Sequence, residues 1–198
     1  MNTKSNFKYF HSSKSKTLDV VLHGSSAGMD SSLINKIVDV SRKNGNSVVA
    51  FNFLFLERGD EHSSGPELVE EIETLKSVLE FCKGESYPTV RLIGKSLGAI
   101  IAAKFLTNLN SEEQTKYEII VFGYVTGSID LKNFVGKTVI IQGEKDKFGN
   151  IEIVKQDMKN AISKDVSYFE IKNADHSYRD PETKEPIYED QAVLQLFS

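Results

Sequence analysis

The sequence predicts an α/β fold: a doubly wound, mostly parallel sheet of about six to seven strands with helices on both faces. Short apolar runs of strand length alternate along the chain with longer segments whose apolar residues recur at helical spacing. Near-continuous apolar strands are typical of parallel sheets that are covered on both faces. Right-handed crossovers between such strands then place helices on both sides of the sheet.

The first strand–helix–strand unit shows this pattern clearly. Residues 18–24 read Leu-Asp-Val-Val-Leu-His-Gly, a buried strand that ends in glycine. The helix expected at 30–44 repeats apolar side chains every three or four residues and stops before Gly45, a common residue after a helix end. Residues 47–55 are rich in Val and Phe and predict the next strand.

The middle of the chain repeats the alternation. The run Ser64-Gly65-Pro66-Glu67 resembles a capping box with proline in the first helical turn. The apolar stripe that follows runs from Leu68 to Cys82 at steps of four and three residues, which predicts one buried helix face. A strand at 89–93 and a helix at 96–109 come next.

The last part of the chain supplies the remaining elements. Runs of Val, Ile and Phe predict strands there, and the segments between them have helical periodicity. The predicted elements are strands at 117–125, 137–142 and 166–171 and helices at 150–162 and 187–197. Functional loops are expected outside the carboxyl ends of the strands.

Length and composition indicate an ordinary globular protein. The 198 residues predict one domain spanning 1–198, because single cores commonly reach ~250 residues. The apolar share of 39% and the charged share of 26% exclude a disordered tail, a collagen and a disulfide scaffold. A net charge of −4 disfavours nucleic acid or an anionic membrane as the main partner.

The amino-terminal segment and the length of the apolar stretches bear on location, whereas the single cysteine favours no compartment. Residues 1–21 are partly basic but lack an apolar run of signal-peptide length. Apolar stretches elsewhere fall far short of the ~20 residues that span a bilayer. Cys82 cannot form an internal disulfide, and its place on a helix stripe predicts a core residue. We therefore expect a cytoplasmic protein without a membrane partner.

The strongest chemical signal is Gly94-Lys95-Ser96-Leu97-Gly98, a G-x-S-x-G motif between a predicted strand and helix. The two glycines leave room for a tight turn that projects the Ser96 hydroxyl at a helix N-terminus. Lys95 is expected to be exposed beside this hydroxyl, where it would favour an anionic substrate. A phosphate-binding loop would need glycine in place of Thr89, in mid-strand, which disfavours that alternative.

A serine nucleophile needs a base and a carboxylate that orients the base. Asp146 follows the strand at 137–142, and His176 follows the strand at 166–171, so both emerge at the same sheet edge as Ser96. We predict His176 as general base and Asp146 as its partner. Asp130 is the fallback carboxylate. The alternative is a solvated acidic loop and a surface histidine.

An oxyanion hole needs two backbone N–H donors. Leu97 supplies one, and the small-residue loop at 23–29 supplies the other, with Ser25 favoured and Ser26 second. His23 is expected to bond that loop rather than to act in catalysis.

Other residues carry weaker predictions. The expected substrate-pocket residues are Ser26, Met29, Tyr124 and Phe148, although each of the large ones could equally be core. The four histidines show no metal-ligand spacing, so no metal and no organic cofactor are expected. The sequence carries no signal for a particular oligomeric state.

With these motifs in place, the chain resembles the α/β-hydrolase superfamily over nearly its whole length, and within it the small, lid-less, dienelactone-hydrolase-like proteins. The run at 23–30, His-Gly-Ser-Ser-Ala-Gly-Met-Asp, and the G-x-S-x-G motif at 94–98 carry the resemblance. It implies a triad of Ser96, Asp146 and His176.

Two departures limit what the resemblance implies. Dienelactone hydrolases proper use a cysteine nucleophile, and Ser96 stands at that position here, so their substrate is not expected. Only residues 126–136 separate two neighbouring predicted strands, which is too little chain for a cap domain.

The function that these predictions favour is hydrolysis of a small carboxylic ester or thioester through an acyl-enzyme. Two alternatives stay open: a non-catalytic interaction module on the same fold, and acyl transfer or peptide cleavage by the same residues.

Overall fold

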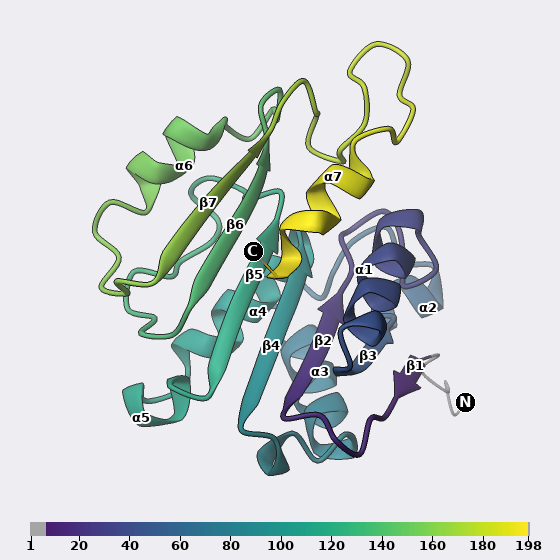
Figure 1. Ribbon diagram of the computed structural model, residues 1–198, viewed down its shortest axis with the longest axis vertical. Helices are drawn as coiled ribbons and strands as arrows, with labels where there is room; N and C mark the ends of the chain where they lie inside the picture. Colours follow the sequence, from purple (N-terminus) through teal and green to yellow (C-terminus); the bar gives the residue numbers. More distant parts are fainter. Residues whose placement is uncertain (1–6, 198) are drawn as a thin grey trace.

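The computed structural model describes residues 7–197 and contains one seven-stranded sheet of order β1-β3-β2-β4-β5-β6-β7 (Figure 1). Strands β2 to β7 are parallel, and β1 pairs antiparallel with β3 at the edge. The prediction of a doubly wound, mostly parallel sheet is confirmed. The strands are β1 Phe7–Phe10, β2 Thr17–Leu22, β3 Ser47–Phe51, β4 Thr89–Lys95, β5 Tyr117–Phe122, β6 Thr138–Gly143 and β7 Val166–Ile171.

Helices cover both faces of the sheet. One face packs against α1 and α7, and the other packs against α2, α3, α4 and α6 (Figure 1). In the described part of the chain, no helix is long and apolar enough to span a bilayer. The helices are α1 Ser32–Lys43, α2 Leu54–Arg58, α3 Val69–Phe81, α4 Leu97–Thr107, α5 Ser111–Gln114, α6 Ile151–Asp157 and α7 Glu189–Leu194, with 3₁₀ turns η1 Gly84–Ser86 and η2 Gln195–Phe197.

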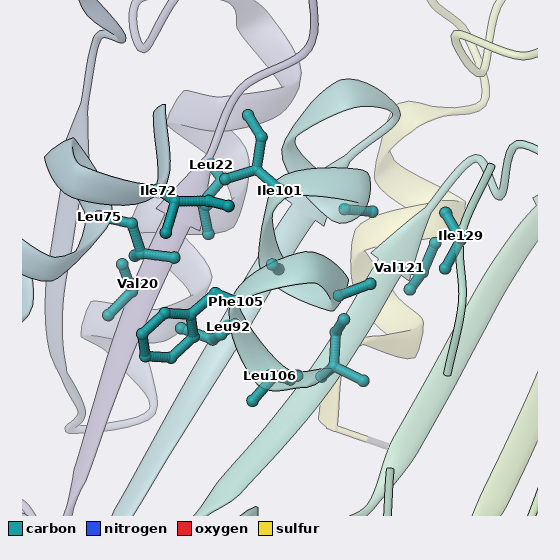
Figure 2. Packing of buried hydrophobic residues seen from close by; sticks show 14 of the residues in the cluster. Val20, Leu22, Ile72, Leu75, Leu92, Ile101, Phe105, Leu106, Val121 and Ile129 are labelled. Carbon is teal, nitrogen blue, oxygen red and sulfur yellow. The ribbon is translucent and has the colours of Figure 1, made fainter. Parts of the chain in front are cut away.

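Two apolar cores lie on opposite faces of the sheet, because successive strand residues point to opposite sides. On β2, Val20 and Leu22 face α3 and α4, whereas Val21 faces α1 and α7. Figure 2 shows the first of these cores, where Leu92 of β4 packs among residues of α4. Truncating such a fully buried leucine to alanine costs about 2–5 kcal/mol of stability.

The strand predicted at 47–55 is shorter than expected. The ladder ends at Phe51, and the backbone N–H of Phe53 donates instead to Nε2 of His23, at 3.0 Å. Helix α2 then starts at Leu54, so the apolar run divides between a strand and a helix. The apolar pattern could not reveal this division, because Phe53 and Phe55, which lie beyond the strand, are as fully buried as the strand residues.

The predicted helix boundaries differ at several places, most clearly at α3 and α6. The capping box at 64–67 does not form: α3 begins at Val69, and the Ser64 backbone N–H donates to Glu71 instead. Helix α6 ends at Asp157 rather than at 162. The Asp157 carboxylate accepts hydrogen bonds from the Tyr124 hydroxyl and the Gly127 N–H, which ties this helix end to the loop after β5.

The strand order places a topological switch at the centre of the sheet. The chain goes from β2 to β3 on one side and then crosses to β4 on the other side of β2. The loops that leave the carboxyl ends of β2 and β4 therefore diverge, and the crevice between them is where open α/β sheets bind ligands. The G-x-S-x-G motif lies at the end of β4.

Candidate active site

Ser96 occupies a strained turn between β4 and α4. Its backbone angles are φ 51° and ψ −112°, a conformation that non-glycine residues rarely adopt. A side chain at Gly94 would collide with the backbone of Ala99, and one at Gly98 would collide with the carbonyl of Leu22. Both glycines are thus required by close packing of the turn, as the motif predicts.

His176 lies within hydrogen-bond distance of both predicted partners. Its Nε2 atom is 3.0 Å from Oγ of Ser96, and its Nδ1 atom is 2.7 Å from Oδ2 of Asp146. These residues follow β7, β4 and β6, so three separate strand ends meet here. Because the Asp146 carboxylate accepts from Nδ1–H, the Nε2 atom that faces Ser96 is free to accept a proton.

The other carboxylates that could be considered as partners of His176, namely Asp175 and Asp130, have different partners. Asp175, the neighbour of His176, accepts the backbone N–H groups of Ser177 and Arg179 and so shapes the loop. Asp130, the fallback acid of the sequence analysis, is exposed and accepts from the backbone N–H of Lys132. Only Asp146, among the described carboxylates, is hydrogen-bonded to the imidazole.

The loop after β2 is held by His23. The N–H of Phe53 donates to His23 Nε2, so Nδ1 carries the proton and donates to the Gly24 carbonyl at 2.6 Å. Burial lowers the pKa of His23, which favours this neutral tautomer. The predicted role of His23 in bonding the loop agrees with these contacts.

The predicted oxyanion donors belong to segments next to Ser96 or lining the same cavity. Leu97 is the first residue of α4, and the first N–H groups of a helix have no partner within the helix. Ser25 and Ser26 line the same cavity as Ser96. That cavity has a volume of about 630 Å³ and lies between the loop after β2 and the segments after β6 and β7.

The structure separates the predicted pocket residues into two groups. Phe148 lines the cavity, and its ring packs edge-on against the imidazole of His176 at a centroid distance of 4.7 Å. Met29 and Tyr124 are buried in the two cores instead, and neither is among the residues that line the cavity. Tyr124 is held in the core by its hydroxyl group, which is within hydrogen-bond distance of the buried Ile129 carbonyl and of the Asp157 carboxylate as acceptors.

Lys95 differs from its prediction. Its stem lines the cavity, but its Nζ atom is sealed from solvent and has no hydrogen-bond partner among the described residues. Burial lowers the pKa of Lys95 to about 7, against an opposing effect of Asp146 and Asp175. The expectation of an exposed ammonium beside Ser96 was wrong, because the side chain folds under the surface towards Gly123 and Tyr178.

The sequence analysis did not identify two side chains that hold loops of the site in place. Gln142, at the end of β6, accepts from the Tyr124 N–H and donates to the Gly149 carbonyl, which braces the loop that carries Asp146. Asn52 accepts from the backbone N–H of Met29 and so holds the loop after β2. A polar amide that follows or closes an apolar strand is the signal that could have found both.

The arrangement can perform nucleophilic chemistry at a carbonyl carbon. It combines a hydroxyl, a base hydrogen-bonded to that hydroxyl, a buried acid that orients the base, and N–H donors at a helix start. In residues 7–197, no group of three or more His, Cys, Asp or Glu side chains is placed to hold a metal ion.

The sequence of residues 15–195 matches a protein family described as an alpha/beta hydrolase domain. This match spans most of the chain, and the chain therefore belongs to the alpha/beta hydrolase family. The resemblance stated from the motifs is thus confirmed at the level of the superfamily. No curated protein matches the sequence.

Solved structures show the same fold. A protein of unknown function from Agrobacterium tumefaciens, proposed to be an alpha/beta hydrolase, superposes with a TM-score of 0.78 at 16% identity, over 97% of this chain and 88% of that one. An alpha-beta serine hydrolase homologue from Coxiella burnetii gives 0.72 at 20% identity, over 97% and 90%. A serine hydrolase without a lid from Xanthomonas campestris gives 0.69 at 18% identity, over 96% and 82%.

Proposed function

We propose that the protein is a serine hydrolase that cleaves a small carboxylic ester or thioester through an acyl-enzyme. The observation that carries this proposal is the hydrogen-bonded series from Ser96 through His176 to Asp146, with distances of 3.0 and 2.7 Å. Membership of the alpha/beta hydrolase family supports a hydrolytic reaction. Within residues 7–197 no cap domain covers the cavity, which suits a small substrate, and the nucleophile and base suit cleavage of an ester or thioester.

Acylation begins when Ser96 Oγ attacks the substrate carbonyl and His176 Nε2 takes the hydroxyl proton. The carbonyl oxygen becomes an oxyanion, which the N–H groups of Leu97 and Ser25 stabilise. Asp146 stabilises the imidazolium that forms. When the tetrahedral intermediate collapses, the bond to the leaving oxygen or sulfur breaks, and His176 gives that atom the proton.

Deacylation repeats the sequence with water. His176 Nε2 takes a proton from a water molecule that attacks the acyl carbon, and the second intermediate releases the acid as Ser96 Oγ recovers its proton. Every proton passes through one imidazole nitrogen, so the chain's own residues suffice for the cycle.

A screen of ester and thioester chain lengths tests this function. We expect wild-type protein to hydrolyse short-chain nitrophenyl esters or acyl thioesters, and Ser96→Ala to lose at least about 10³-fold in kcat. Ser77→Ala is a matched control, because Ser77 is exposed on α3, away from the cavity. The proposal is wrong if wild type and Ser96→Ala hydrolyse every substrate at the same rate.

A further inference from the structure

The walls of the cavity differ in charge. One wall comes from the loop after β2 and the start of α1 and consists of serine, alanine and apolar side chains. The opposite wall comes from the segments after β6 and β7, and it presents four exposed cationic side chains: Lys145, Lys147, Arg179 and Lys184. This concentration of positive charge stands out in a chain whose net charge is −4.

These four cations have no described carboxylate at ion-pair distance, although Lys145 and Lys184 act at longer range on Glu144 and Asp180, where they add to the backbone hydrogen bonds that lower the pKa of each carboxyl. None of them forms an ion pair with an Asp or Glu of residues 7–197. Lys147 lies over the Phe148 ring at 4.9 Å, and Lys184 donates to the Pro181 carbonyl. The charges of Lys147 and Arg179 in particular are therefore available to a ligand in the cavity.

The carboxylates that line the cavity offset only part of this charge, because Asp175 is the only one of them without a cationic partner. Two line the cavity: Asp175 accepts two backbone N–H groups of its own loop, and Glu189 accepts from Ser32 and pairs with Lys36. The other acids of the loop, Asp180, Glu182 and Glu185, are not among the lining residues.

The position of the imidazole tells which part of a substrate meets the cationic wall. In the proposed reaction, His176 protonates the leaving atom, so the leaving group must lie on the imidazole side of the acyl carbon. Phe148, which packs against that imidazole, belongs to the same segment as Lys145 and Lys147. Arg179 and Lys184 follow His176 in the chain. The uncharged wall, at Ser25 and beyond, is left for the acyl group.

We propose that the cationic wall binds an anionic leaving group, an alcohol or thiol that carries a phosphate or carboxylate away from the scissile bond. The inference rests on the proposed function, since it uses the direction in which His176 delivers its proton. Arginine and lysine attract such anions strongly at low ionic strength, and salt screens the attraction. The acyl group is uncharged and small.

Two thioesters that differ only in one phosphate test this selectivity: butyryl-pantetheine and butyryl-4′-phosphopantetheine. We expect kcat/KM for the phosphorylated substrate to exceed that for the neutral one by about 10-fold or more at low salt. The ratio should fall as sodium chloride rises from about 20 to about 300 mM. Succinyl-pantetheine, whose charge is on the acyl side, should gain no such advantage over butyryl-pantetheine.

Substitutions on both cationic segments locate the effect. In the double variant Lys147→Gln/Arg179→Gln, the ratio of the two kcat/KM values should approach one. Lys159→Gln is the matched control, because this exposed lysine lies after α6 and does not line the cavity. A ratio that stays high in the double variant would overturn the assignment of the wall.

A binding measurement separates failure of this inference from failure of the proposed function. Calorimetry with Ser96→Ala needs no turnover, and 4′-phosphopantetheine should bind at least about 10-fold more tightly than pantetheine. Equal affinities, or equal kcat/KM for the two thioesters, contradict the inference and leave the hydrolase intact. Selective binding without Ser96-dependent turnover of any ester contradicts the proposed function instead.

Discussion

The carboxylate of Asp146 lies 2.7 Å from Nδ1 of His176, and no part of its side chain is exposed to solvent. Its other oxygen accepts the backbone N–H of Phe148 at 2.8 Å, so both oxygens are fixed. The acid therefore holds the imidazole in one orientation and one tautomer, with Nε2 directed at Ser96. This geometry is what gives the substitutions below their expected effects.

The first prediction concerns Asp146→Asn. An amide of the same shape keeps the packing, but it no longer stabilises the imidazolium or enforces the tautomer, so kcat should fall about 10³- to 10⁴-fold. Circular dichroism checks that the fold persists. Asp130→Asn is the matched control, because that carboxylate is exposed and bonds only a local backbone N–H. If Asp130→Asn loses activity and Asp146→Asn does not, the carboxylate that orients His176 is Asp130 and the assignment of Asp146 is wrong.

The second prediction concerns the pH dependence of stability. Burial lowers the pKa of Lys95 from 10.5 to about 7, so between these values the unfolded chain binds a proton that the folded chain does not. The free energy of unfolding should therefore gain a rising contribution from pH 7 towards pH 10. Below pH 7 both states are protonated, and the folded state bears the full cost of the buried charge.

Lys95→Met should remove this contribution. Methionine fills similar space without charge, so the variant should be more stable than wild type by about 2–4 kcal/mol at pH 7, with the difference shrinking as pH rises towards 10. Urea unfolding at several pH values measures both quantities. Lys159→Met serves as the exposed control. A variant that is less stable than wild type at pH 7 would show that the ammonium has a stabilising partner.

The third prediction concerns Gly123, which follows β5 with φ +70°. A Cβ atom there would lie 2.9 Å from Cε1 of His176 and 2.7 Å from Nζ of Lys95, so alanine must displace the imidazole. A shift of about 1 Å can cost about 10²-fold in rate, and we expect Gly123→Ala to lower kcat by at least that factor.

Gly127→Ala is the control for this substitution. Its φ of +76° imposes nearly the same backbone strain, but its added Cβ would meet no atom within 4 Å. Backbone strain should cost both variants about 1 kcal/mol of stability, the steric contacts should cost Gly123→Ala more, and only Gly123→Ala should lose activity. Equal activities in the two variants would mean that the imidazole tolerates the contact.

Much of the fold follows from local pattern, because the central parallel strands are mostly buried and their apolar runs are nearly continuous. The turn at 94–98 was also predictable from its glycines. The structure shows why glycine is needed, because α4 packs so closely on β2 that a side chain at Gly98 would collide with the Leu22 carbonyl. Strand β1 was not, because four edge residues carry too little periodicity to separate them from a loop. The division of 47–55 into β3 and α2 depends on a distant contact to His23.

Some features of the site were predictable from the sequence and others were not. Chain order and strand ends sufficed to bring Ser96, Asp146 and His176 together, because the carboxyl ends of parallel strands share one edge. The path of the Lys95 side chain and the burial of Tyr124 were not predictable, since both depend on tertiary neighbours that no local spacing records.

Labelling with a fluorophosphonate tests the central claim most directly, because this probe phosphonylates an activated serine hydroxyl. Mass spectrometry of the wild-type protein should show one covalent adduct, which peptide mapping places on Ser96. Ser96→Ala should show none, and His176→Ala should label far more slowly, because the hydroxyl loses its base. An adduct on another residue, or equal labelling of wild type and Ser96→Ala, would contradict the account.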